Sequence, residues 1–188
     1  MAVKFGLEDL TKLKEMVKEQ TEAEFDGQSR MKLKRAILDE LDKAHSFELP
    51  PNMVEAEFEN IWAQVQAEKT AGQLDEDDAK KTDKQLEKDY RKIAERRVRL
   101  GLVLAEMGQK EEVTISNEEL QGAMIAEARR YPGQEQQVIE FYQKNPNAIA
   151  QLRAPIFEEK VVDLIIEKAE VKDKKVKEAK LFEEDPML

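Results

Sequence analysis

The sequence contains no cysteine. Disulfides, thiolate nucleophiles and cysteine-bound zinc sites are therefore excluded together. No apolar run approaches the roughly 18 residues that a membrane-spanning helix needs, and the opening "MAVKFGLEDL" lacks the apolar core of a signal peptide. We therefore expect a soluble, cytoplasmic chain without a membrane partner.

Glycine, proline and aromatic residues are also scarce. The 188 residues include 7 glycines and 6 prolines, and only 6% are aromatic. Charged residues make up 38% and hydrophobic residues 40%, which is enough for a core but not for a large one. Alternation typical of strands is rare. The composition predicts an all-α, elongated architecture with much solvated surface.

An excess of basic charge is missing as well. Lysine and arginine number 31 against 41 acidic residues, for a formal net charge of -10. Because basic side chains supply most of the affinity for a phosphate backbone, we expect no direct nucleic-acid binding. One basic cluster exists and comprises Arg91, Lys92, Arg96, Arg97 and Arg99. The interleaved Glu87, Asp89 and Glu95 predict that it is a solvated helix face with ion pairs.

Motifs for catalysis, metals or cofactors are absent too. His45 is the only histidine and has no visible nucleophile beside it, so we expect a structural or solvated role. The acidic run 75–78 lacks the spacing and glycine of a calcium loop, which predicts a solvated loop. Gly101 has no companion glycines, so it does not belong to a phosphate-binding loop. Because glycine inside a helix is unfavourable, we interpret Gly101 as a site of close contact between helices. We expect no enzymatic activity, cofactor or metal.

What the chain does contain is apolar residues at three- and four-residue spacing, which predict helices along most of its length. A first helix is expected from Leu7 to Ala44, leaving the core or bending near Gly27. The prolines at 50–51 predict the start of a second helix. A third is expected to begin at Thr82, which has capping-box spacing to Gln85, and to stop around 107–108.

The last part of the chain carries further helix signals. Ser116 and Glu119 repeat the capping-box spacing and predict a fourth helix over 117–131. A short fifth helix is expected over 135–144, and Asn145 with Pro146 predicts the start of a sixth that ends near residue 169. Pro155, if that helix is continuous, would remove the bond to the Gln151 carbonyl and kink it. The alternating charges after it predict a frayed helix or a disordered tail.

Apolar side chains near helix ends and hairpin tips are the remaining candidates for function. Phe58 and Trp62 lie within periodic stripes, which favours ordinary packing. A turn in the last helical pair is flanked by Tyr131, Val138 and Phe141. This pair is too short for a core of its own, so the sequence leaves open whether these side chains are packed or exposed to solvent. Exposed apolar groups rimmed by charge are typical of protein-binding surfaces. The candidate binding residues are Met53, Phe58, Trp62, Met124, Tyr131, Val138, Phe141 and Tyr142.

The sequence from Ala94 to Val171 closely resembles the carboxy-terminal domain of bacterial trigger factor, a family of ribosome-associated chaperones. The segments "QVIEFYQKN" and "ELPPNMVEAE" are the specific part of this resemblance, which covers Phe5 to about Phe182. It implies an elongated helical body with two projecting helical arms that enclose a cradle for unfolded or nascent polypeptides. The body would comprise about 5–49 with 168–182, arm one about 50–112, arm two about 113–167, and the tail 183–188.

The resemblance also implies functional residues and absences. Clients contact apolar side chains of the second arm's hairpin in the family, and those positions fall on Tyr131, Val138 and Phe141 here. Glu127 stands where the family can place an apolar residue. We expect the family's ribosome-binding domain and its FKBP-like prolyl isomerase domain to be absent. We therefore expect ATP-independent holding of clients, no isomerase activity, and ribosome contact only through the missing domain.

Two alternatives stay open at this point. One is a helical scaffold module that binds a single specific partner or self-associates, although drifting apolar spacing and interrupting glycines argue against a coiled coil. The other is a related periplasmic chaperone domain. Binding of several unrelated unfolded chains would distinguish a promiscuous chaperone from a scaffold.

Overall fold

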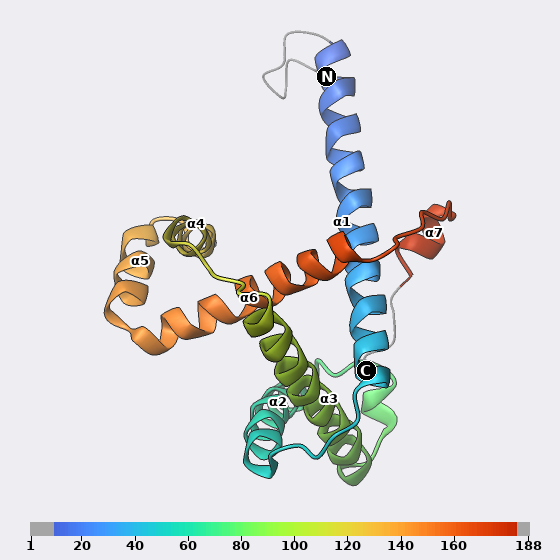
Figure 1. Cartoon of the computed structure of the whole chain (residues 1–188), viewed down its shortest axis with the longest axis vertical. Helices are drawn as coiled ribbons and strands as arrows, with labels where there is room; N and C mark the ends of the chain where they lie inside the picture. The colour runs from blue at the N-terminus through green and yellow to red at the C-terminus, as the bar shows by residue number, and fades with distance from the viewer. Residues whose placement is uncertain (1–9, 184–188) are drawn as a thin grey trace. The chain divides into compact units, whose positions relative to one another are not determined.

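A computed structural model describes residues 10–183, and all regular structure within that range is helical. The helices labelled in Figure 1 are α1 (Leu10–Ala44), α2 (Pro51–Ala71), α3 (Asp83–Lys110), α4 (Asn117–Ala128), α5 (Glu135–Lys144), α6 (Pro146–Lys168) and α7 (Glu178–Leu181). A 3-10 turn, η2 (Asp78–Lys80), precedes α3. The all-α prediction is confirmed. The predicted helix start at Leu7 lies outside the described residues, as do residues 184–188 of the tail.

The chain divides into two compact units. Among the described residues, the first contains 10–40 together with 172–183, and the second contains 41–171. Within the first unit, the ring of Phe25 packs edge to face on Phe182 with 5.3 Å between centroids. Lys32 Nζ also donates to the carbonyl of Glu183 at 2.9 Å. Phe182 and Glu183 are therefore held on α1, although α7 itself spans only one turn.

Helix α1 runs through Gly27 without interruption. Nearly all side chains between Thr11 and Glu24 are exposed, as expected of a helix segment that leaves the core. Its second half supplies the partly buried residues that follow Met31. The polar composition around Gly27 therefore reflects solvent exposure and not a break in the helix.

Helices α2 and α3 lie side by side and form an antiparallel hairpin (Figure 1). The buried core between them consists of Phe58, Ile61, Val65, Leu86, Tyr90 and Ala94. Full burial of a large apolar side chain contributes about 1.5–3 kcal/mol, so this stripe is the main stabilising contact of the hairpin. Gly72 ends α2 in a left-handed conformation with φ 67°. Thr82 and Gln85 form the predicted capping box at the start of α3.

The contact between α3 and α6 depends on Gly108. Helix α3 continues past this residue to Lys110, so the predicted stop is wrong. A Cβ atom at Gly108 would lie 2.2 Å from Phe157 Cζ and 2.9 Å from Val161 Cγ2. Only glycine therefore permits this approach of α6. Gly101, where the sequence predicted a close helix contact, has no atom within 4 Å of such a Cβ, and that prediction is also wrong.

The second half of the chain follows the predicted start signals closely. Ser116 and Glu119 form a capping box at the start of α4. The Asn145 side chain accepts a hydrogen bond from the Ala148 N–H at 3.3 Å, and Pro146 is the first residue of α6. Helix α6 is continuous through Pro155, whose missing N–H leaves that position without its helical hydrogen bond. Helices α4, α5 and α6 pack against one another.

Candidate functional site

The α4–α5 hairpin presents large apolar side chains to solvent. Tyr131, in the turn between the helices, is 50% exposed, and Phe141 on α5 is 55% exposed. Val138 and Tyr142 are half-buried, and the Tyr142 ring meets that of Phe141 edge to face at 5.6 Å. We call Tyr131, Val138, Phe141 and Tyr142 the α4–α5 patch. Tyr131 and Phe141 keep about half of their surface in water, so their burial contributes little to the stability of the fold.

Local structure explains how the patch is positioned. Helix α5 has only 10 residues and no buried one, and a helix of this length is marginal in isolation. Gly133, with φ 84°, forms the turn before it, and the Asn145 N–H donates to the Tyr142 carbonyl at its other end. Lys160 Nζ of α6 contacts Glu119 of α4 at 2.6 Å, and this bond is the first cause that lowers the pKa of Glu119. This ion pair joins α6 to α4, and α5 packs against both of these helices.

Charged residues surround the patch. Arg130 pairs with Glu127 at 3.0 Å, and Lys144 pairs with Glu140 at 3.1 Å. Such exposed pairs contribute little to stability, with typical values of about 0–1 kcal/mol. They do keep a surface with exposed aromatic groups soluble. An apolar patch with a charged rim is typical of a site that binds other polypeptides.

The other predicted binding residues divide by exposure. Met53 is 46% exposed near the start of α2. Phe58 is only 6% exposed because it packs against α3, and Met124 is 9% exposed. Trp62 is half-buried and stacks on Phe58 with 5.8 Å between ring centroids. The accessible candidates are therefore Met53 and the α4–α5 patch, with Trp62 accessible in part. We leave Phe58 and Met124 out of the proposed surface.

Sequence analysis missed one exposed apolar residue of this hairpin, Ile125, which is 46% exposed. Successive residues on a helix point about 100° apart, so burial of Met124 turns Ile125 towards solvent. The apolar pair alone did not indicate which of the two side chains would be buried.

An apolar groove beside α6 was also missed. Its volume is about 650 Å³, and it is lined by Val113, Thr114, Ile115, Ala150, Arg153, Ala154 and Phe157. One wall is the connection between α3 and α4, and the other is a face of α6. The short segment "VTIS" is visible in the sequence as one wall of the groove. The α6 residues that form the other wall lie more than thirty residues further along the chain, so the sequence does not show that the two walls meet.

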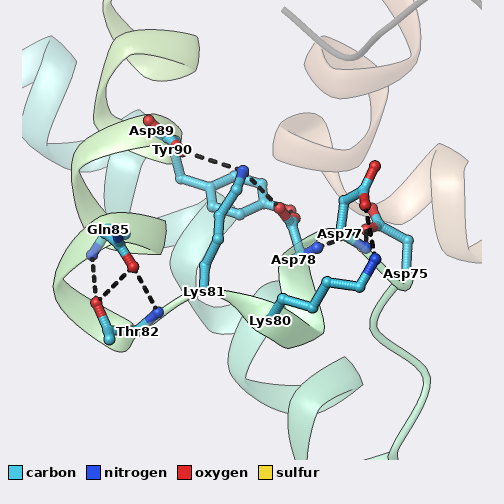
Figure 2. A network of polar contacts seen from close by, with 9 residues as sticks. All are labelled: Asp75, Asp77, Asp78, Lys80, Lys81, Thr82, Gln85, Asp89 and Tyr90. Carbon is cyan, nitrogen blue, oxygen red and sulfur yellow. Dashed lines mark hydrogen bonds and ion pairs between the residues drawn. The ribbon is translucent and has the colours of Figure 1, made fainter.

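The acidic run at 75–78 is not a solvated loop throughout. Asp78 is 7% exposed and accepts hydrogen bonds from Tyr90 Oη and, at 2.9 Å, from Lys81 Nζ (Figure 2). Asp75 Oδ1 accepts from the N–H groups of Asp77 at 2.9 Å and Asp78 at 2.7 Å. The prediction of a solvated loop is therefore wrong for Asp78. Residues 10–183 contain no grouping of side chains suited to a metal.

The network shifts the pKa values of its members. Burial raises the pKa of Asp78, but the hydrogen bonds from Tyr90 and Lys81, with the charge of Lys81, outweigh it and lower the pKa below its ordinary value. Burial, followed by the hydrogen bond to Asp78, raises the pKa of Tyr90. Lys81 also pairs with Asp89 at 3.1 Å (Figure 2). The arrangement is a structural clamp between the turn η2 and α3.

Ion pairs at the basic cluster are confirmed, although the partners differ from those expected. The prediction of a solvated face is wrong for Arg91, Arg96 and Arg99, which are partly buried. Arg91 binds both oxygens of Glu55 on α2, at 2.7 and 3.3 Å. Arg99 pairs with Asp42 near the end of α1 at 2.6 Å. Arg91 also lies 4.1 Å above the Phe58 ring. These arginines therefore join elements within the second unit instead of pairing along α3.

His45 lies at the end of α1, and its Nδ1 is 2.8 Å from the Leu41 carbonyl oxygen. This contact agrees with the expected structural role. Among the helices of residues 10–183, none combines the length and apolar character required to cross a bilayer.

Comparisons with known proteins are consistent with the resemblance in sequence. The family model described as the bacterial trigger factor protein C-terminus matches residues 9–167. Trigger factor of Hyphomonas neptunium is 56% identical over 180 residues, which are 96% of this chain and 40% of that protein. Trigger factor of Caulobacter vibrioides is 51% identical over 187 residues and 41% of its length. The chain thus spans about two fifths of the length of these curated relatives.

A solved structure has a similar fold. A trigger factor chain from Thermotoga maritima matches with a TM-score of 0.62 and covers 87% of this chain and 97% of its own. The sequences are 16% identical, so this similarity concerns the fold alone.

Proposed function

The chain belongs to the bacterial trigger factor C-terminal family, and on this premise we propose that it is an ATP-independent chaperone domain for unfolded or nascent polypeptides. The observation that carries the proposal is the exposure of Tyr131 and Phe141, at 50% and 55%, on a hairpin rimmed by ion pairs. These side chains would contact apolar segments of clients, together with Val138, Tyr142 and Met53.

The energetics favour several weak contacts. Burial of apolar surface contributes roughly 25 cal/mol per Å² before the cost of ordering the client, so one small patch binds weakly. Met53 adds a flexible, polarisable side chain that adapts to different partners. Clients held at a few such places can bind in many ways and dissociate without ATP.

The organisation that we propose follows the family. A body of about 5–49 with 168–182 would carry arm one, about 50–112, and arm two, about 113–167, on either side of a cradle. We place the protein in the cytoplasm and assign no catalytic activity to this chain. Prolyl isomerisation and contact with the ribosome would belong to parts of the longer relatives that lie outside it.

The test is suppression of client aggregation by a double variant, Tyr131→Ala with Phe141→Ala. We expect weaker suppression with nearly unchanged helicity and melting temperature, because both side chains are half-exposed. Gln137→Ala with Gln143→Ala is the matched control, since both glutamines are exposed on the same helix. Suppression at the wild-type level by the first variant would contradict the proposal. Binding of one folded partner and of no unfolded chain would favour a scaffold.

A further inference from the structure

The connection between α3 and α4, residues 113–116, has no regular secondary structure, and part of its backbone is unpaired. It leads into α4 through Ser116, which is extended with φ -73° and ψ 163°. The Val113 N–H donates to the Gly108 carbonyl at 2.8 Å, and the Ser116 N–H donates to Glu119 Oε2 at 2.7 Å. Between them, the main-chain groups of Thr114 and Ile115 form no hydrogen bond with any residue that the structure describes. An extended segment with free N–H and C=O groups is a template for an added strand.

Exposure along this segment alternates with a period of two. Val113 and Ile115 are half-buried, whereas Thr114 between them is exposed. This is the pattern of a strand with one face on a neighbour. Because the N–H and C=O of one residue point to the same side of a strand, Thr114 can exchange two hydrogen bonds with one residue of an antiparallel partner.

The groove beside this segment leaves room for such a partner. Its volume is about 650 Å³, and the α6 wall is formed by Ala150, Arg153, Ala154 and Phe157. Ala150 and Ala154 are one helical turn apart and are small, so a second backbone can approach the helix closely. The Phe157 ring is half-buried and supplies apolar surface at one end.

The charge of the groove differs from that of the chain. Arg153 is exposed and is the only ionisable residue that lines the groove, whereas the whole chain has a formal net charge of -10. Arg153 forms no ion pair with another residue in the described range 10–183. A carboxylate of a bound segment would find a cation here without a competing acidic group in the lining.

We propose that this groove binds an extended, apolar segment of an unfolded polypeptide as a strand added beside Thr114, with an acidic group of the segment at Arg153. The inference rests on the proposed chaperone function and specifies a second binding mode for it. Main-chain hydrogen bonds do not depend on the client's side chains, so this mode suits many sequences. The groove should prefer client segments that carry an acidic group, whereas the net negative charge of the chain as a whole disfavours them.

The experiment uses a short fluorescein-labelled peptide of alternating valine and glutamine that ends in glutamate. Its binding to the chain is measured by anisotropy. Ala154→Glu places a longer, charged side chain in the groove at an exposed helix position, and Gln151→Glu adds the same charge on the same helix outside the lining. We expect binding at least about tenfold weaker for Ala154→Glu, the value for a loss of roughly two hydrogen bonds, and no change for Gln151→Glu.

Two further measurements separate main-chain pairing from simple apolar contact. A peptide with N-methylated valines should bind wild type about tenfold more weakly, because one edge of its backbone can no longer donate. Replacing the terminal glutamate by lysine should weaken binding about two- to fivefold, and Arg153→Gln should abolish that difference. The N-methylated peptide needs no protein variant, so it tests the proposal even if Ala154→Glu unfolds.

The outcomes separate this inference from the proposed function. Equal binding of the methylated and unmethylated peptides would overturn strand addition. If a permanently unfolded protein binds wild type and loses affinity with the Tyr131 and Phe141 variant but not with Ala154→Glu, the groove proposal alone fails. If wild type binds neither the peptide nor the unfolded protein, both proposals fail.

Discussion

Replacing Gly108 by alanine tests the packing of α6 on α3. A Cβ at this position would lie 2.2 Å from Phe157 Cζ, 2.8 Å from Phe157 Cε1 and 2.9 Å from Val161 Cγ2. All three distances are shorter than van der Waals contact, so the Phe157 ring or the helix must move. Overpacking of this kind costs about 1–3 kcal/mol. Alanine is favoured over glycine within a helix by about 1 kcal/mol, so the net destabilisation should be about 0–2 kcal/mol.

Gly101→Ala is the matched control for this change. Gly101 lies on the same helix and is exposed, and a Cβ added there would have no atom within 4 Å apart from its own stretch of helix. It gains the helix propensity of alanine without a clash, so this variant should be more stable than wild type by about 1 kcal/mol. The two variants should therefore differ by about 1–3 kcal/mol in the free energy of unfolding.

The assay is urea unfolding followed by circular dichroism. Gly108→Ala and Gly101→Ala are each measured alone and in combination with Phe157→Leu. Removing the ring removes the two nearest clashing atoms, so Phe157→Leu should reduce the cost of Gly108→Ala and leave the gain from Gly101→Ala unchanged. A coupling of about 1 kcal/mol is expected for residues in direct contact. If Gly108→Ala stabilises the chain as much as Gly101→Ala does, the close approach of α3 and α6 is refuted.

Two further predictions concern the network around Asp78. Tyr90→Phe removes a hydrogen bond to a buried carboxylate and should destabilise the chain by about 1.5–3 kcal/mol, as measured by the same unfolding assay; an unchanged midpoint would show that the bond contributes nothing. Because the folded state lowers the pKa of Asp78, its contribution to stability is present above the ordinary value of about 4 and is lost as the pH falls through the lower folded value. The stability difference between wild type and Asp78→Asn should therefore shrink at acidic pH, and a difference that grows there would contradict this sign.

Local signals in the sequence predicted helix starts well. Thr82 with Gln85, Ser116 with Glu119, and Pro146 after Asn145 each act within one turn of chain, so their chemistry is visible in a few letters. The all-α fold follows from the same kind of evidence, because helix periodicity is a local property.

Contacts between distant residues could not be predicted in this way. Gly108 and Gly101 are both glycines in one helix, and only the position of α6 distinguishes them. Asp78 looked like part of a solvated run because its partner Tyr90 lies on another element. Met124 and Ile125 are adjacent apolar residues, and the packing of neighbouring helices decides which of them faces solvent.

NMR chemical-shift mapping with a permanently unfolded client tests whether exposed apolar residues of this chain bind unfolded polypeptide. We expect shifts at Tyr131, Val138, Phe141, Tyr142 and Met53. The buried Phe58 and Val161 should shift little, because a client cannot reach them. Shifts confined to other surfaces, or no shifts at saturating client, would contradict the account.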